Sequence, residues 1–209
     1  MADPHRAGHE LLYYPGEVNL LRANVVVINK VDTATEPDIE TVRRNVRQRN
    51  PLAKVIEAAS RVEVDSPEKI RGARVLVVED GPTLTHGEMA FGAGVVAARQ
   101  WGAAEMVDPR PYAIGSLSQV YEKYKHIGRL LPAMGYSPTQ LAELEATIHR
   151  TPCDAVLVAT PIDLGKVVDI SQPAVRVRYE IVEQSQLTLA EVLGEFVAHE
   201  KRIPVSAGV

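Results

Sequence analysis

The chain has 209 residues, of which 45% are hydrophobic and 24% are charged, fractions that are ordinary for a globular protein. No apolar run approaches the roughly 20 residues that cross a bilayer, and the first residues lack the basic-then-apolar order of a secretion signal. The single cysteine, Cys153, excludes a disulfide framework, and the net charge of −4 disfavours binding to nucleic-acid phosphates. The sequence predicts a soluble, cytoplasmic protein with no nucleic-acid or membrane partner.

Strand-like and helix-like segments alternate along the chain. Residues 24–29 form an apolar, β-branched run that is typical of a strand buried on both faces, and residues 36–50 carry apolar side chains at helical spacing. Further strands are expected at 54–58, 74–79, 104–107, 155–159 and 174–182, and further helices at 66–67 onward, 88–101, 138–150 and 189–199. This alternation predicts an α/β fold with a mostly parallel sheet flanked by helices.

Two regions give no regular pattern. We expect no strand or helix in residues 1–23, which are rich in polar side chains, and residues 110–135 are irregular, with Pro, Gly and Tyr scattered through them. A change in the pattern near residue 66 is the candidate domain boundary.

The most informative short motif is the tetrapeptide from Asn29 to Asp32, which has the form N-K-x-D and follows a buried strand. It resembles the base-reading signature of P-loop GTPases, in which the Asp carboxylate accepts two guanine protons, the Lys stem covers the base, and the Asn ties this loop to the phosphate loop. Ala59 and Ser60 follow the next strand, where such GTPases place a loop against the base. We therefore assign Asn29, Lys30, Asp32, Ala59 and Ser60 to a nucleotide site. The alternative is an ordinary polar turn.

The phosphate-binding loop of such enzymes, G-x-x-x-x-G-K-[ST], does not occur in the chain. The residues that would hold the β- and γ-phosphates and magnesium are therefore absent from this sequence, and we expect the isolated chain to be inactive.

Three polar turns follow predicted strands, at residues 80–87, 108–112 and 160–163. Because ligands of open parallel sheets bind outside the carboxyl ends of the strands, we expect these turns to lie at one edge of the sheet. Arg176 and Arg178 share one face of the strand at 174–182.

Each of these residues has a simpler structural alternative. Arginines on a strand face, such as Arg176 and Arg178, are most often solvated or ion-paired, and His86 is equally well explained as a capping residue. We interpret His126, His149 and His199 as surface residues and Cys153 as a structural thiol. His5, His9 and Glu10 match no standard zinc spacing, so no metal ligands are assigned.

Longer blocks of the sequence resemble one family. They lie at residues 2–17, 24–34, 50–60, 75–94, 102–116, 131–136, 160–164 and 173–180, and together they closely resemble the cyclic 2,3-diphosphoglycerate synthetase family, whose members are also described as predicted GTPases. Members of that family are longer and carry the phosphate loop upstream, so the resemblance implies that this chain is the carboxyl half. It further implies that residues 1–66 complete a P-loop NTPase-like domain and that residues 67–209 form an α/β substrate-binding domain.

The resemblance implies a ligase that closes a phosphoanhydride ring within 2,3-bisphosphoglycerate, using ATP, or GTP as the N-K-x-D motif suggests, with Mg²⁺ held by the missing half. A small phosphorylated substrate is then the expected partner, and the sequence is compatible with a homo-oligomer. The implied catalytic residues are Asp3, Arg6, His9 and His86, and the implied substrate-binding residues are Thr83, Thr85, Gly87, Arg110, Arg176 and Arg178. Two alternatives stay open: a regulatory or metallochaperone-type GTPase, in which Asp3, His5 and His9 form a switch, and a fragment that is inactive without its other half.

Overall fold

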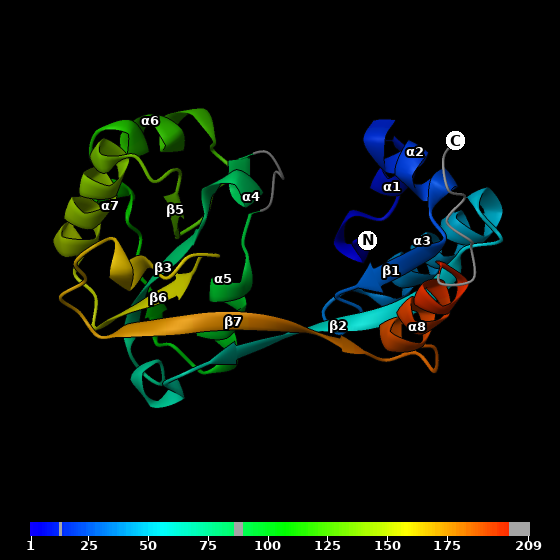
Figure 1. Ribbon diagram of the computed structural model, residues 1–209. Coiled ribbons are helices and arrows are strands. Elements are labelled where there is room, and N and C mark those ends of the chain that lie inside the picture. The colour runs from blue at the N-terminus through cyan, green and yellow to red at the C-terminus, as the bar shows by residue number, and fades with distance from the viewer. Residues whose placement is uncertain (13, 86–89, 201–209) are drawn as a thin grey trace, which may run out of the picture. The chain divides into compact units, whose positions relative to one another are not determined.

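The computed structural model describes residues 1–12, 14–85 and 90–200, and its elements are drawn in Figure 1. Contacts divide the chain into two units. Unit 1 comprises Met1–Arg61 and Glu180–Val209, and unit 2 comprises Val62–Tyr179. Each unit has a separate cluster of buried apolar side chains. The observed α/β architecture with a mostly parallel, helix-flanked sheet is the predicted fold class.

Unit 1 is built on strand β1 (Val25–Asn29), which pairs in parallel with β2 (Lys54–Val64). Ala2 forms a parallel bridge to Ile28, so the first residues of the chain extend the sheet along the other edge of β1. Helix α3 (Glu36–Arg49) packs on β1 through Val42 and Val46, which are buried. The N-cap of α3 is Thr35, whose hydroxyl accepts the Asp38 N–H, and Pro37 occupies the first turn, as the helical pattern predicts.

The first 23 residues differ from the prediction. They form a 3₁₀ turn η1 (Pro4–Arg6) and two helices, α1 (His9–Leu12) and α2 (Tyr14–Arg22). The expectation of no regular structure was wrong because Pro15 and Gly16, which indicate a turn in isolation, lie in the first turn of α2, where proline's missing N–H costs no helical bond. Leu20 of this helix is buried in the core of unit 1.

Unit 2 contains four whole strands, of which β3 is central, and parts of two others. The whole strands are β3 (Arg74–Asp80), β4 (Glu105–Met106), β5 (Leu131–Ala133) and β6 (Ala155–Ala159), and the unit also includes the last residues of β2 and the first part of β7 (Ala174–Glu183). Strand β3 pairs in parallel with β4, β5 and β6, and β6 pairs in parallel with β7. Residues 75–79 of β3 are all buried, which explains the continuous apolar run in the sequence.

Helices cover both faces of this sheet. Figure 1 shows α5 (Ala93–Gln100) on one side of β3 and β6, and α7 (Pro138–Arg150) on the other, beside α6 (Ser116–Lys123). Helix α7 carries the predicted capping box, with Ser137 and Gln140 bonded to each other's backbone. The remaining elements of unit 2 are the short helix α4 (Gly81–Thr85) and the 3₁₀ turns η2 (Pro67–Lys69), η3 (Arg110–Tyr112) and η4 (Leu164–Lys166).

Strands β2 and β7 both pass from one unit into the other. Gln184 donates its N–H to the carbonyl of Glu57 in unit 1, and Asp65 donates to the carbonyl of Arg176 in unit 2. These two bonds show that β2 and β7 run antiparallel, so the series of parallel units is interrupted here. Beyond β7 the chain enters helix α8 (Leu189–Glu200) of unit 1. The expected division at residue 66 assigned residues 180–209 to the second domain, whereas their contacts group them with the first.

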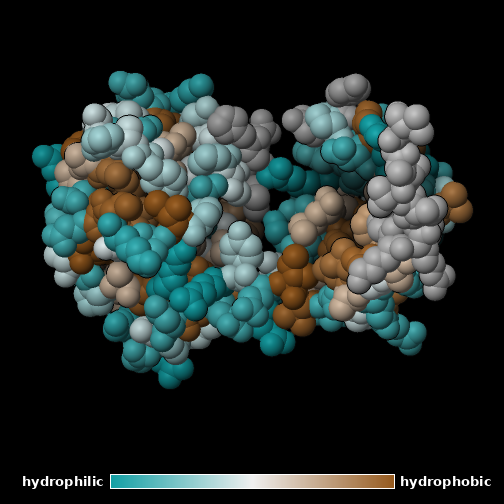
Figure 2. All heavy atoms as spheres, viewed as in Figure 1, coloured by the Kyte–Doolittle hydropathy of each residue, from teal (hydrophilic) through white to brown (hydrophobic). Residues whose placement is uncertain are grey.

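The surface of both units is mixed in polarity, with hydrophobic patches among hydrophilic residues (Figure 2). Helix α8 exposes Leu193, Phe196 and Val197, which share one helical face. No helix among the described residues is long and apolar enough to cross a membrane.

Candidate functional site

Unit 1 brings two loops together with part of strand β2, at one edge of its parallel strands. The loop after Ala2 contains Asp3, the loop after β1 contains Lys30 and Asp32, and Ser60 lies farther along β2. This is the edge at which open parallel sheets bind ligands. The predicted nucleotide residues of the N-K-x-D motif and of the following strand thus lie in one place.

The first loop contacts the N-K-x-D loop through an ion pair. The ammonium of Lys30 lies 2.5 Å from Asp3 Oδ2, and both side chains are less than one-third exposed. The other oxygen, Asp3 Oδ1, accepts the backbone N–H of His5 and so caps the turn η1. Lys30 has φ of 64°, a left-handed conformation that costs a side-chain-bearing residue roughly 1–2 kcal/mol. Such a conformation persists only where its surroundings hold it, and here Asp3 is part of them.

Two further contacts fix the N-K-x-D loop. His5 Nε2 lies 2.9 Å from the hydroxyl of Thr33, which joins the first loop to the second. On the opposite side, Asp32 Oδ1 accepts the backbone N–H of Ser60 at 3.1 Å. Asp32 remains exposed, and a carboxylate that accepts one hydrogen bond keeps further lone pairs for a ligand.

Asn29 has a buried side-chain oxygen with no partner. Only 8% of the residue is exposed, and its Oδ1 makes no hydrogen bond within the described part of the chain. Buried polar atoms are normally paired, because an unpaired one costs about 1–3 kcal/mol. The Oδ1 atom can therefore accept a hydrogen bond from a donor outside the described residues. This is what we expect of the Asn of an N-K-x-D motif, which ties this loop to the phosphate loop.

Of the other residues predicted here, Ala59 is buried and His9 is exposed at the start of α1. Arg6 is half-buried in η1. Glu10 accepts hydrogen bonds from Gly8 and Asn45. No group of three His, Cys, Asp or Glu side chains suited to a metal occurs in the described ranges, so no residue is assigned to Mg²⁺ or zinc.

In unit 2, three of the predicted polar turns lie at one edge. Asp80 is the last residue of β3, Asp108 and Thr160 follow β4 and β6, and these strands run parallel. Tyr136 follows β5 at the same edge. Its pKa is raised, mainly by burial and also by the charge of Asp80, while the charge of Arg176 partly opposes this shift. Asn29, the last residue of β1, belongs to unit 1 and is not part of this edge of unit 2.

A buried carboxyl group lies behind this edge. Glu79 is 4% exposed, and its Oε1 accepts the backbone N–H groups of Gly92, Gly94 and Val95 at the start of α5. Burial raises the pKa of Glu79 to about 7, although these three N–H groups lower it. The two glycines permit the approach: a Cβ on Gly92 would lie 2.4 Å from Glu79 Oε2. Helix α5 consequently begins at Ala93, after the start expected at residue 88; residues 88–89 lie outside the described ranges.

Two of the predicted anion-binding arginines are engaged by protein groups. Arg110 forms a forked ion pair with Asp108, with Nη2 2.5 Å from Oδ2 and Nε 2.8 Å from Oδ1, and this pair holds the pKa of Asp108 below its usual range. Arg176 donates to the carbonyls of Pro161 and Ile162 and so fixes the turn after β6. Arg178 is exposed.

The segment expected to be a glycine loop is helical in part. Thr83 donates its hydroxyl to Asp80 Oδ2, and Thr85 donates to the carbonyl of Gly81 within α4. Both hydroxyl groups therefore act in the local structure. His86 and Gly87 lie outside the described residues.

Sequence reasoning did not identify Glu79 or Tyr136. Glu79 ends an apolar strand, and only the glycines at 92 and 94 hinted at a close approach. Tyr136 precedes a helix cap and carried no motif.

Comparison with known proteins places this geometry in context. Over 203 residues the chain is 54% identical to the arginine synthetase ArcE of Thermococcus kodakarensis, and the match covers 97% of this chain and 45% of that protein. The chain is a relative of this synthetase. It spans less than half the length of the relative. No family model matches the chain. Membership of the cyclic 2,3-diphosphoglycerate synthetase family stays a prediction.

Proposed function

We propose that the protein is a nucleotide-dependent ligase of the arginine synthetase type, in which unit 1 contributes to the nucleotide site and unit 2 to the substrate site. The observation that carries this proposal is the 54% identity to an arginine synthetase across 97% of the chain. A match that extends through both units includes the loops at both strand-end edges.

In this proposal, the loops of unit 1 bind the nucleotide base. The carboxylate of Asp32 accepts base protons, and Ser60 fixes its orientation through the 3.1 Å hydrogen bond. Lys30, held by Asp3, covers the base with its stem. Recognition by a carboxylate favours guanine, whereas the family resemblance favours ATP, so both nucleotides belong in the test.

The phosphates and Mg²⁺ would be held by residues outside this chain, because no phosphate loop occurs in the sequence. Phosphoryl transfer is catalysed mainly by positioning and charge neutralisation. The role of this chain is therefore to select the base and to hold the acceptor.

A second candidate is ring closure in 2,3-bisphosphoglycerate, which the sequence blocks at 75–94 and 102–116 favour. That reaction needs several free cations around a highly anionic substrate. The geometry supports it less well, because the guanidinium groups of Arg110 and Arg176 are already bonded to Asp108 and to two carbonyl groups.

The test is a chimera in which this chain replaces the matching segment of the Thermococcus arginine synthetase. In the reverse direction, such a synthetase splits arginine, with water, into the two molecules that it joins in the forward direction. The triphosphate forms in the same reaction from nucleoside diphosphate and phosphate, or from the monophosphate and pyrophosphate. We expect arginine-dependent formation of ATP or GTP by the chimera, measured beside the parent enzyme. Asp32→Ala should weaken nucleotide binding, whereas Asp169→Ala, an exposed control in unit 2, should not.

A folded chimera that makes no triphosphate from arginine would overturn the proposal. Turnover of ATP with 2,3-bisphosphoglycerate would favour the second candidate. Nucleotide hydrolysis that is indifferent to both compounds would favour a regulatory GTPase.

A further inference from the structure

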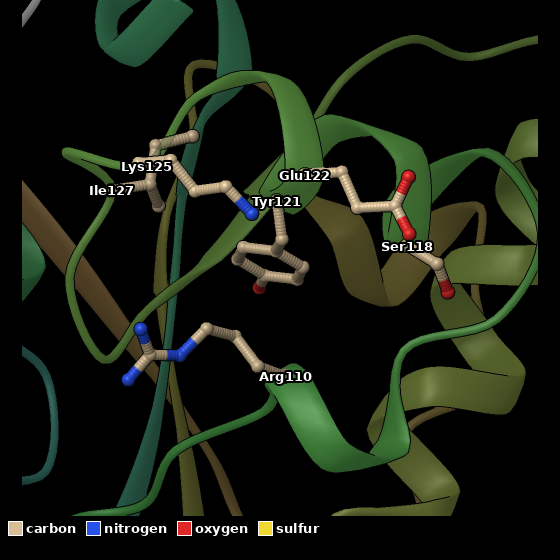
Figure 3. A pocket seen from close by; sticks show the side chains of 6 residues that line it. All are labelled: Arg110, Ser118, Tyr121, Glu122, Lys125 and Ile127. Carbon is tan, nitrogen blue, oxygen red and sulfur yellow. The ribbon is translucent and has the colours of Figure 1, made fainter.

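Unit 2 contains a pocket near the carboxyl end of β4. Of the residues that line it, only Arg110 was predicted from the sequence as a site residue. It has a volume of about 290 Å³ and is lined by Arg110, Ser118, Tyr121, Glu122, Lys125 and Ile127 (Figure 3). This volume lies at the lower end of the range for small-molecule sites. The pocket therefore suits a ligand of metabolite size.

The floor of the pocket is apolar and fixed. Tyr121 is 8% exposed, and its hydroxyl donates to the carbonyl of Leu130 at 2.8 Å, which fixes the position of the side chain. Burial raises the pKa of Tyr121, which keeps the phenol neutral. Ile127 beside it is almost fully buried. A flat ring of this kind can cover the methylene stem of a ligand.

Positive charge gathers on one side of the ring. In Figure 3 the ammonium of Lys125 and the guanidinium of Arg110 lie to the same side of Tyr121. Asp108 binds Nε and Nη2 of Arg110, which orients the guanidinium, and Nη1 makes no hydrogen bond to the residues that the structure describes. Lys125 has no hydrogen-bond or ion-pair partner within the described part of the chain.

Negative charge lies on the other side. The carboxylate of Glu122 lies beside Ser118, away from Lys125 (Figure 3). Ser118 donates its hydroxyl hydrogen to the carbonyl of Ala113, so it has no hydrogen left to donate to the Glu122 carboxylate. Glu122 and Lys125 are three residues apart, a spacing at which opposite charges commonly pair, yet they form no ion pair. Two opposite charges thus lie apart across an apolar floor.

We propose that this pocket binds the amino-acid substrate or product of the ligase, with its carboxylate at Lys125 and Arg110 and its cationic end at Glu122. This inference rests on the proposed function. Arginine has this form, with a carboxylate, an apolar stem that can lie over Tyr121, and a planar guanidinium that matches a carboxylate in a forked pair.

The first experiment is calorimetric titration of the 209-residue chain with arginine at low salt, because all six lining residues belong to this chain. Lys125→Gln and Glu122→Gln should each weaken arginine binding by about tenfold or more, the usual effect of losing one charge-assisted contact. The matched control is Lys123→Gln. It removes the same charge two residues away, where the ammonium lies 5.0 Å from the ring of Tyr124 and does not line the pocket.

The second experiment identifies which end of the ligand each residue holds. Agmatine is arginine without the carboxylate, so its binding should be weaker, insensitive to Lys125→Gln and still sensitive to Glu122→Gln. The inference is overturned if the two variants bind arginine like the Lys123→Gln control, if agmatine responds equally to both, or if arginine does not bind. It is also overturned if inorganic phosphate displaces arginine in a manner that depends on Lys125 alone, which indicates a simple anion site.

These outcomes are separable from those of the proposed function. A chimera that makes triphosphate from arginine, together with pocket variants that bind normally, rejects the pocket and keeps the ligase. Arginine binding that depends on both residues, together with an inactive chimera, rejects the ligase and keeps an amino-acid site.

Discussion

At Glu79, burial and hydrogen bonding act in opposite directions. The carboxyl group is removed from water, which disfavours its charge, while three N–H groups at the start of α5 favour the charge. Burial is the larger effect and raises the pKa to about 7. The group lies directly behind the strand-end edge of unit 2, so its proton is coupled to the packing of α5 against β3.

This coupling predicts a pH dependence of stability. Between the ordinary pKa of 4.5 and about 7, the folded protein keeps a proton that the unfolded chain has released, so the free energy of unfolding falls as pH rises. The loss approaches about 3 kcal/mol above the upper value. Glu79→Gln stays neutral at every pH, and urea denaturation should show that it lacks this decline. The exposed control Glu68→Gln should retain it. An unchanged decline in the Glu79 variant would show that another group is responsible.

At this scale the sequence predicted which residues of one candidate site lie near each other, but not the contacts that they make. The positions of Asn29, Lys30, Asp32 and Ser60 were sufficient to place them near each other, because they lie at or just beyond the paired segments of two adjacent parallel strands. The ion pair between Lys30 and Asp3 was not predictable, because it depends on the chain's first residues lying along β1. Likewise, the sequence predicted a polar turn at residues 108–112 but not the pairing of Arg110 with Asp108 in it.

Among the secondary-structure elements, α5 shows how closely helix and sheet approach in unit 2. A Cβ on Gly94 would lie 2.6 Å from Val77 Cγ1 and 3.1 Å from Ala159 Cβ, so a methyl group cannot be added without displacement. The sequence indicated a close approach here through its two glycines. The sequence predicted the first residue of α5 less well. The free N–H groups at the beginning of this helix are bound by Glu79 of strand β3 and not by a capping residue next to the helix in the chain.

Two alanine substitutions test this packing. Gly94→Ala should lower the free energy of unfolding by roughly 1–3 kcal/mol, because it overpacks a buried contact. Gly194→Ala in α8 has open space around the new methyl group, so it should raise stability by about 1 kcal/mol through helix propensity. Chemical denaturation followed by circular dichroism measures both. Equal effects of the two substitutions would contradict the close contact at Gly94.

Local signals also explain which elements were predictable. Ser137 and Thr188 each begin a helix with a capping box, and both boxes form as expected. The antiparallel pairing of β2 with β7 was not expected, because each strand's own residues specify a strand but not its neighbour. Partner choice depends on contacts between residues far apart in the chain.

For the molecule as a whole, the division into units follows from the two long strands. All buried residues of the larger core lie between Ile70 and Val177, and those of the smaller core lie between Ala2 and Val46. No buried residue is shared between the two cores. Strand β7 continues past Tyr179 into unit 1, and the segment that begins at Glu180 therefore belongs to the same unit as the first part of the chain. A single boundary near residue 66 would have placed this segment in the second domain.

This arrangement predicts that the segment Val62–Tyr179 folds on its own. It is continuous, it contains a complete apolar core, and its sheet keeps every pairing of β3 with β4, β5 and β6. Trp101 is the chain's single tryptophan and packs against this core, so its fluorescence reports on unit 2 alone. The isolated segment should unfold in urea with one cooperative fluorescence transition that resembles that of the full chain.

The matched comparison is the segment Met1–Arg61, which is only one part of a discontinuous unit. It lacks Gln184, whose N–H binds the carbonyl of Glu57, and it lacks helix α8, whose Glu195 forms an ion pair with Lys54. This segment should therefore be much less stable than unit 2. Circular dichroism of this segment should show a weak, broad transition. The converse result, a cooperative Met1–Arg61 and a Val62–Tyr179 segment without a fluorescence transition, would mean that the larger core needs unit 1 in order to form.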